Sequence, residues 1–265
     1  MRALWTAASG MKNLQLSIDT ISNNLANVNT NSYKSQRTEF KDLMYEKLSH
    51  KDNSDKLGVP INLEVGHGVK SAAITRSFQT GSFQASSNPL DVAIEGDGFF
   101  VIQDNKGDRL LTRDGAFKLG LTENGTRLVT SDGYLVLGEG DTEIPLDGEI
   151  SEIKIDFDGT VMVRRQNQDA AAFETVGKIQ INQVTNAAGL LSVGDNQYKT
   201  SPASGEAFQP EGEKNKLLQK YLEMSNVQVV DEMVNMITAQ RAYEINSKAI
   251  QTADQMLEIA NQLKR

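Results

Sequence analysis

The sequence predicts an α+β fold in which helices from the two ends of the chain pair and a mostly antiparallel β body is inserted between them. Apolar residues recur every seven positions near both ends, and between the ends short β-branched and aromatic runs alternate with glycine-containing turns. A 3-4 spacing keeps apolar side chains on one side of a helix, as in a coiled coil. We therefore expect a terminal helical domain of residues 1–30 plus 217–265, a bridging region with an extended stretch over 31–70, and a β-rich outer domain over 71–216.

The first helix is predicted from a repeat that no proline interrupts. One line of this repeat consists of Leu4, Met11, Ile18 and Leu25, and the line three residues later consists of Ala7, Leu14, Ile21 and Val28. We expect the helix to end in the asparagine-rich run 22–31, because asparagine competes for backbone hydrogen bonds and tolerates left-handed conformations. These asparagines form either a long C-cap and turn or a set of amides that bond between neighbouring copies.

The C-terminal helix is predicted from a matching repeat. Its large residues are Val229, Met236, Tyr243, Ile250 and Leu257, and the line three residues later holds Ala239, Asn246, Ala253 and Ala260. Large side chains of the first helix can pack over these small ones. We expect Ser225 or Asn226 as the N-cap, with Asp231 and Glu232 in the first turns, where the helix dipole favours negative charge.

Two long helices with one shared seam are marginally stable by themselves, because ordering their backbone offsets most of what the buried seam contributes. We therefore predict that the terminal helices become ordered when further copies of the chain pack around them. The large apolar residues of the two seams, from Leu4 to Val28 and from Val229 to Leu257, are the predicted self-assembly residues.

The middle of the chain begins with a short segment, Thr38 to Leu48, whose apolar residues suggest another helix, and continues into a polar loop or linker over 49–60. From residue 66 to about 205, short apolar runs predict strands at 92–94, 99–102, 110–112, 127–130, 134–137, 153–155, 161–163 and 177–184. Tight hairpin turns are predicted at Asp97-Gly98, Asp114-Gly115, Asn124-Gly125, Asp132-Gly133 and Asp158-Gly159. Residues 186–216 are expected to be rich in loops.

Composition excludes several classes of function. The formal net charge of -8 argues against binding to a nucleic-acid backbone or an anionic membrane. The chain has no cysteine, so it has neither disulfides nor thiolate metal sites. The N-terminus lacks the apolar core of a signal peptide, and no run approaches the length of a membrane span. If the protein leaves the cytoplasm, we expect a route that keeps its N-terminus.

No catalytic, metal or cofactor site is expected. His50 and His67 lie in loop sequences without metal-ligand spacing or a nearby nucleophile signal. The run Asp156 to Gly159 begins like a calcium loop but lacks the later glutamate, and Gly96-Asp97-Gly98 lacks the third glycine of a dinucleotide site. The chain is therefore interpreted as a structural protein and not an enzyme.

Four segments of the chain resemble one family. The run SNNLANVNTNSYK (22–34), the strand motif LDVAIEGDGFF (90–100) with TRDGAF (112–117), and the segment 232–257 are similar, in this order, to the signatures of the bacterial flagellar rod and hook family. The residues that carry the two terminal signatures are Asn23, Asn24, Asn27, Asn29, Tyr33, Gln240, Arg241, Tyr243 and Asn246.

The resemblance implies a structural subunit of the rod, nearest in likeness to its distal part. Such a subunit polymerises into a rigid hollow tube that transmits torque and passes export substrates. The implied partners are further copies, adjacent rod and hook subunits, the flagellar type III export apparatus and, if an outer membrane is present, ring proteins. The resemblance also implies that an extended stretch, here residues 46–65, stiffens the tube. Gln240, Asn246 or Gln251 is expected to line the channel.

Two alternatives remain open. The chain can be a proximal rod or hook-like member of the same family. From a different class, it can be a surface adhesion or carbohydrate-binding β domain on a helical stalk. The second alternative needs an aromatic-lined face, and the low aromatic content (6%) with Trp5 as the single tryptophan disfavours it.

Overall fold

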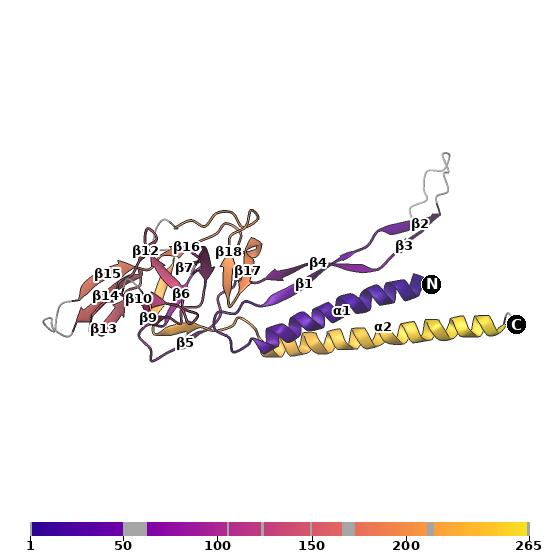
Figure 1. Ribbon diagram of the computed structural model, residues 1–265. Helices are drawn as coiled ribbons and strands as arrows, with labels where there is room; N and C mark the ends of the chain where they lie inside the picture. Colours follow the sequence, from indigo (N-terminus) through magenta and orange to yellow (C-terminus); the bar gives the residue numbers. More distant parts are fainter. Residues whose placement is uncertain are drawn as a thin grey trace, which may run out of the picture. The chain divides into compact units, whose positions relative to one another are not determined.

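The computed structural model describes residues 2–49, 63–104, 106–122, 125–148, 150–165, 173–210 and 215–263. The chain forms two compact units. Unit 1 comprises Met1–Ala26, Gln36–Arg76 and Gln228–Arg265, and unit 2 comprises Asn27–Ser35 and Ser77–Val227. The predicted α+β fold is confirmed. The chain begins and ends with a long helix, and the segment between the helices forms a large antiparallel β body (Figure 1).

Unit 1 contains the two long helices and a β arm. Helix α1 spans Arg2–Ala26 and helix α2 spans Val229–Leu263. In the arm, β1 (Gln36–Asp42) pairs with β4 (Val69–Arg76), and β2 (Tyr45–Ser49) pairs with β3 (Leu63–Gly66), both antiparallel. The Asn13 amide donates to the carbonyls of Ser9 and of Val69, each at 2.8 Å, and so joins α1 to β4.

The prediction of a helix over Thr38–Leu48 is wrong, because β1 and β2 contain all of these residues except Leu43 and Met44. The β1–β4 ladder runs from Gln36 opposite Arg76 to Asp42 opposite Val69. Local apolar spacing contains no information about a partner strand this far away in the sequence, so the periodicity was ambiguous. Residues 50–62, most of the stretch expected to stiffen a polymer, lie outside the described residues.

The sequence predicted where α1 ends and which residue caps the start of α2. Helix α1 ends at Ala26, inside the asparagine-rich run as predicted. The predicted N-cap of α2 is wrong: the Gln228 carbonyl accepts the first helical bond, from Glu232 N at 3.0 Å, so the cap position is Gln228. Asp231 and Glu232 do lie in the first turn, as expected from the helix dipole.

Unit 2 is a β body. Its strands are β5 (Phe83–Ala85), β6 (Val92–Glu95), β7 (Phe99–Gln103), β8 (Arg109–Thr112), β9 (Lys118–Thr122), β10 (Gly125–Val129), β11 (Leu135–Gly138), β12 (Thr142–Glu143), β13 (Ile150–Ile155), β14 (Thr160–Arg165), β15 (Glu174–Lys178), β16 (Ile181–Asn182), β17 (Leu191–Gly194), β18 (Gln197–Lys199), β19 (Lys216–Gln219) and β20 (Tyr221–Glu223). A 3-10 turn, η1 (Ala187–Gly189), precedes β17. The main sheet has the order β17-β18-β8-β7-β11-β10-β9, with β12 beside β11 and β16 beside β7. Smaller sheets are β13-β14-β15, β6-β19 and β5-β20.

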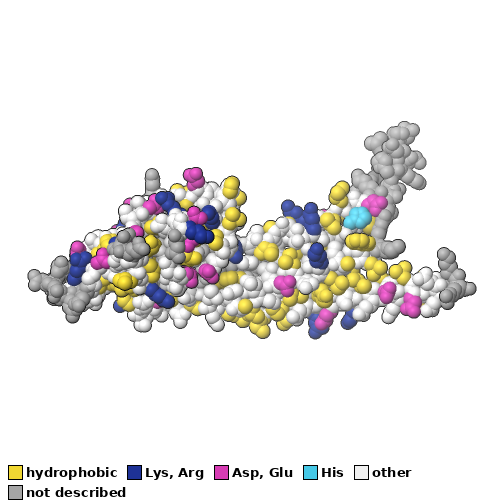
Figure 2. Space-filling view, in the orientation of Figure 1, with side chains coloured by type: hydrophobic (Ala, Val, Ile, Leu, Met, Phe, Trp, Pro, Cys, Tyr) yellow, Lys and Arg dark blue, Asp and Glu magenta, His cyan; other side chains and the backbone are white. Residues whose placement is uncertain are grey.

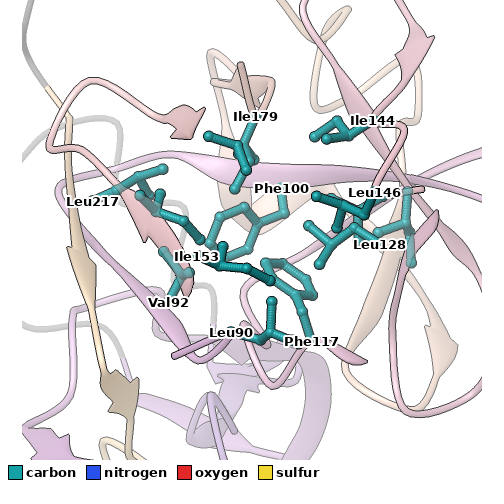
Figure 3. Packing of buried hydrophobic residues seen from close by; sticks show 14 of the residues in the cluster. Leu90, Val92, Phe100, Phe117, Leu128, Ile144, Leu146, Ile153, Ile179 and Leu217 are labelled. Atoms are coloured by element: carbon teal, nitrogen blue, oxygen red, sulfur yellow. The ribbon is translucent and has the colours of Figure 1, made fainter. Parts of the chain in front are cut away.

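The core of unit 2 follows from strand alternation. Along β7, Phe100 and Ile102 belong to one buried cluster, while Phe99 and Val101 belong to another, because successive side chains of a strand point to opposite faces. In the first cluster the rings of Phe100 and Phe117 meet edge to face, with centroids 4.9 Å apart (Figure 3). Residues from β13 and β14 complete this cluster, so the three-stranded sheet covers that face of the main sheet.

The predicted turns divide into two kinds. Gly125, Gly133 and Gly159 have positive φ (111°, 87° and 91°), as predicted for tight hairpin turns. Gly98 and Gly115 do not, so the turn prediction is wrong there. A Cβ on Gly115 would lie 1.7 Å from the carbonyl oxygen of Val92, so glycine is required at this position for space.

The last part of the β body departs from its prediction in two places. The strand expected over 177–184 is divided between the end of β15 and the short β16, and the loop expected over 186–216 contains the β17–β18 hairpin. The hairpin pairs Leu191 with Lys199 around a turn in which Asp195 and Asn196 both have positive φ.

Candidate assembly surface and its anchoring

The helices α1 and α2 of unit 1 lie side by side and antiparallel (Figure 1). A Cβ on Gly10 would lie 3.2 Å from the amide nitrogen of Asn246. Near the other end, the Asn24 amide donates to Oε1 of Glu232 at 3.1 Å. Residue 10 thus meets residue 246 and residue 24 meets residue 232, so both contacts belong to one antiparallel register.

The structure brings most of the predicted seam residues between or beside these helices. Ala7, Ile21 and Ala239 are buried. Partly buried seam residues are Leu4, Met11, Leu14, Ile18, Leu25, Met236 and Ile250. More exposed are Val229, Tyr243 and Leu257, at 39%, 38% and 42%. Val28 is not part of the seam, since it follows the end of α1 and belongs to unit 2.

A second apolar stripe runs along the other side of α2, and the heptad pattern of the sequence did not predict it. Its residues are Val230, Val234, Ile237, Ile245, Met256, Ile259 and Leu263, whose exposed fractions lie between 54% and 82%. Successive steps of three, four, eight or eleven residues keep them near one face of a helix, about half a turn from Ala239 and Asn246. Figure 2 shows hydrophobic side chains at the surface of the part formed by the helices.

The α2 helix is also longer than its partner. By the register above, the first residue of α1, Arg2, falls opposite Asp254, so the last turns of α2 from Gln255 to Leu263 extend past α1. Within the described residues, this end of α2 is exposed at every position. The extension carries three of the seven stripe residues and leaves apolar side chains without cover.

Asn24 ties three segments of unit 1 together. Its Oδ1 accepts from Gln36 N at 2.9 Å, its amide donates to Gln36 O at 2.8 Å, and the same amide donates to Glu232. The fully buried side chain therefore joins the end of α1 to the starts of β1 and α2. Burial is the main reason that the pKa of Glu232 is raised; the Asn24 hydrogen bond opposes this and Asp231 adds to it.

The other signature asparagines have different surroundings. Asn27 Oδ1 accepts from the Thr30 hydroxyl at 3.2 Å, so Asn27 takes part in the turn after α1. Asn23 and Asn29 are exposed. Two interpretations of the asparagine-rich run 22–31 were open. The cap-and-turn interpretation fits Asn27. Amide pairing between copies does not apply to Asn24, because its hydrogen bonds are made inside unit 1.

A buried ionic cluster in unit 2 joins the segment that follows α1 to the segment that precedes α2. Lys34 Nζ donates to Glu223 Oε1 at 2.6 Å and to the Gln79 carbonyl at 2.9 Å. On the other side, Arg113 donates to Glu223 Oε2 at 3.5 Å and to the Gly96 carbonyl at 2.6 Å. The side chains of Lys34, Arg113 and Glu223 are 0–1% exposed. One carboxylate is thus shared by two buried cations.

The environment of this cluster is electrostatically unusual. Burial lowers the pKa of Lys34 from its ordinary value, Arg113 lowers it further, and Glu223 opposes both. Arg113 also lies over the ring of Phe99, 5.3 Å from its centroid. Tyr33, next to Lys34, is buried, and the Ser32 hydroxyl donates to the Arg113 carbonyl at 2.8 Å. Such an arrangement holds segments in place but offers no open position for a substrate.

The remaining signature residues lie on α2. Gln240 and Arg241 are exposed, and Asn246 is half-buried against Gly10. Arg241 donates to Glu244 at 3.0 Å.

His67 lies 3.6 Å from a carboxylate oxygen of Glu46, and His50 is outside the described residues. Among the described residues, no three His, Asp or Glu side chains are grouped to hold a metal ion, and no helix combines the length and hydropathy of a membrane span.

The described residues thus combine paired terminal helices, an inserted β body and an apolar stripe on α2 that α1 leaves uncovered. Three family models match the chain: a flagella basal body rod protein model at residues 4–34, a flagellar hook protein FlgE/F/G D1 domain at 93–163, and a flagellar basal body rod FlgEFG protein C-terminal model at 218–263. The chain belongs to the flagellar basal-body rod protein family, which confirms the resemblance seen in the sequence. Lys34, Arg113 and Glu223 come one from each matched segment.

Relatives match over the whole chain. The chain is 45% identical to the flagellar basal-body rod protein FlgG of Borreliella burgdorferi, over 100% of this chain and 99% of that protein. It is 37% identical to FlgG of Bacillus subtilis and 32% identical to the flagellar hook-basal body complex protein FlhP of the same bacterium, in both cases over the full length of both chains.

Proposed function

We propose that the chain is the subunit of the distal rod and that it polymerises into a rigid hollow tube, which carries torque from the motor to the hook and lets export substrates pass. The observation that carries this proposal is the stripe of seven exposed apolar residues on α2, on the side that α1 leaves uncovered. Burying such a stripe contributes on the order of 10 kcal/mol per copy before the cost of association.

The two units have different roles in this proposal. Helices α1 and α2 of unit 1 form the inner tube, and the β body of unit 2 forms the outer layer. The β arm of unit 1, β1 to β4, takes the bridging role expected of residues 31–70. The seam residues predicted from the sequence then serve assembly together with the second stripe. Gln240 and Gln251, both exposed, are the proposed lining of the channel; Asn246 is less suited to it, because it packs against Gly10.

The proposed partners follow from a position in the rod. They are further copies of the chain, adjacent rod and hook subunits, the flagellar type III export apparatus and, in a bacterium with an outer membrane, the surrounding rings. The protein then acts outside the cytoplasm, exported without a cleaved signal peptide. It acts by packing and needs no catalysis or cofactor, and its net negative charge is unsuited to nucleic acid.

A proximal rod or hook-like position is the second candidate. The chain is more similar to the basal-body rod protein FlgG of Bacillus subtilis (37% identical) than to the hook-basal body complex protein FlhP of the same bacterium (32% identical). This difference favours a position in the rod. Immunogold labelling of isolated hook–basal bodies distinguishes the positions, since label at the hook-proximal part of the rod is expected and label only near the export apparatus contradicts the distal assignment.

Electron microscopy of the purified protein tests self-assembly. At high concentration we expect tubes or protofilaments. Replacing Val234 and Ile237 together by aspartate should prevent them, while the variant keeps the circular dichroism spectrum of the dilute wild-type monomer. The matched control is L191D/V193D, which replaces two exposed apolar residues of β17 in unit 2 (59% and 58%) and should leave assembly unchanged. A wild-type protein that stays monomeric at all concentrations contradicts the proposal.

A further inference from the structure

The exposed stripe of α2 is divided in the middle by charged residues. Arg241 lies on the same side of the helix as Val234 and Ile237, because steps of three and four residues join them. Glu244 and Ile245 follow Arg241 by three and four residues and lie on the two edges of the same side. The side chains of Arg241 and Glu244 are 73% and 55% exposed. Lys248, one turn further, is the third charged residue of this face. The apolar stripe is therefore interrupted by a short charged segment between its two apolar ends.

These charges contribute little to the stability of a single chain. An exposed pair three residues apart on a helix stabilises it by about 0.2–0.5 kcal/mol. Charges inside a stripe that other copies bury instead reduce the apolar area available for packing. Charged or polar residues at such positions in coiled coils select one register and one partner at a cost in stability.

We propose that Arg241 and Glu244 fix the axial register between neighbouring copies, with Arg241 of one copy paired to Glu244 of the next. This inference rests on the proposed polymer and adds the residue pair that aligns its subunits. A second copy is the occupant that the charges favour, because every copy supplies both a cation and an anion, so Arg241 of one helix can meet Glu244 of an identical helix. When Arg241 and Glu244 pair correctly, the apolar stripe residues on both sides of the charged segment also meet apolar residues of the neighbouring copy.

Charge reversal in separate chains tests the pairing. R241E leaves two carboxylates on the face and E244R leaves only cations, so either variant alone places like charges opposite each other. We expect each to raise the critical concentration for assembly at least about tenfold. An equimolar mixture of R241E and E244R should assemble near the wild-type concentration, because copies of the two kinds are complementary. The double variant R241E/E244R should also assemble.

The mixture separates contacts between copies from contacts within one helix. If the pair acts only inside its own helix, both single variants remain defective when mixed, and that result overturns the inference. Single variants that assemble like wild type overturn it as well. The control R109E reverses one partner of the exposed Arg109–Asp141 pair in unit 2 and should leave assembly unchanged. If wild type itself does not polymerise, the proposed function fails first and this inference with it.

Discussion

The ammonium group of Lys34 lies 2.6 Å from Oε1 of Glu223, although 189 residues separate the two in the sequence. Arg113 contacts the other oxygen of the same carboxylate. Buried charges are tolerated when they are paired and hydrogen-bonded, and here the Gly81 backbone N–H also donates to Glu223 at 2.9 Å. The cluster therefore fixes the segment after α1 and the segment before α2 within unit 2.

Removing Glu223 should cost more stability than removing Lys34. E223Q leaves two buried cations without a counter-charge, whereas K34M leaves Arg113 paired with Glu223. We expect E223Q to destabilise unit 2 by about 3–5 kcal/mol and K34M by less, as measured by chemical denaturation. K199M, which breaks the exposed Lys199–Asp108 pair, is the control and should have little effect. Equal losses for E223Q and K34M would contradict the shared-carboxylate interpretation.

Asp114 predicts a pH dependence of unit 2. Burial raises the pKa of its carboxyl above the ordinary 3.8, and the nearby Asp132 and Asp91 add to the shift, while the Ala116 backbone N–H opposes it. For a raised pKa, the stabilising contribution is present below pH 3.8 and is lost as the pH rises through the folded-state value.

The substitution D114N isolates this effect, because an amide oxygen can still accept from Ala116 N. The variant should gain stability relative to wild type as the pH rises from about 3.5 to about 7. Denaturation midpoints of both proteins over this range provide the measurement. A difference that does not change with pH would show that Asp114 titrates normally.

Gly115 is required for space and not for a turn. In G115A the new methyl group would overlap the Val92 carbonyl, so strand β6 must shift. We expect a loss of about 1–3 kcal/mol or more in the free energy of unfolding. G133A is the matched control: its site is open and only the positive φ opposes alanine, which costs roughly 1–2 kcal/mol. The space argument is refuted if G133A proves the more harmful substitution.

The sequence was sufficient for features that depend on local pattern. Heptad spacing located both helices, and short apolar runs between glycine turns located strands such as β7, where Phe99 to Ile102 line both cores. The family signatures marked Asn24, and the matched run ended at Lys34, but they did not show that the partners of these residues are Gln36 and Glu223. The failures depend on distant neighbours: β1 needs β4, and the need for glycine at 115 comes from β6.

The second stripe of α2 was missed for another reason. Its signal was present in the spacing of Val230, Val234 and Ile237 and again of Met256, Ile259 and Leu263. The charged residues Arg241 and Lys248 interrupt it, so a search for one continuous seam finds only the side that packs on α1. A helix with apolar residues on two opposite sides is expected where more than one neighbour packs against it.

The central claim is that other copies of the chain cover the exposed stripe of α2. The natural sequence has no cysteine, so a single cysteine in I237C can be labelled with a maleimide without background. Its labelling rate should fall at least about tenfold when dilute protein is concentrated into polymer, while E206C, on an exposed loop of unit 2, should keep its rate. If I237C reacts equally fast in monomer and polymer, the stripe is not the assembly surface.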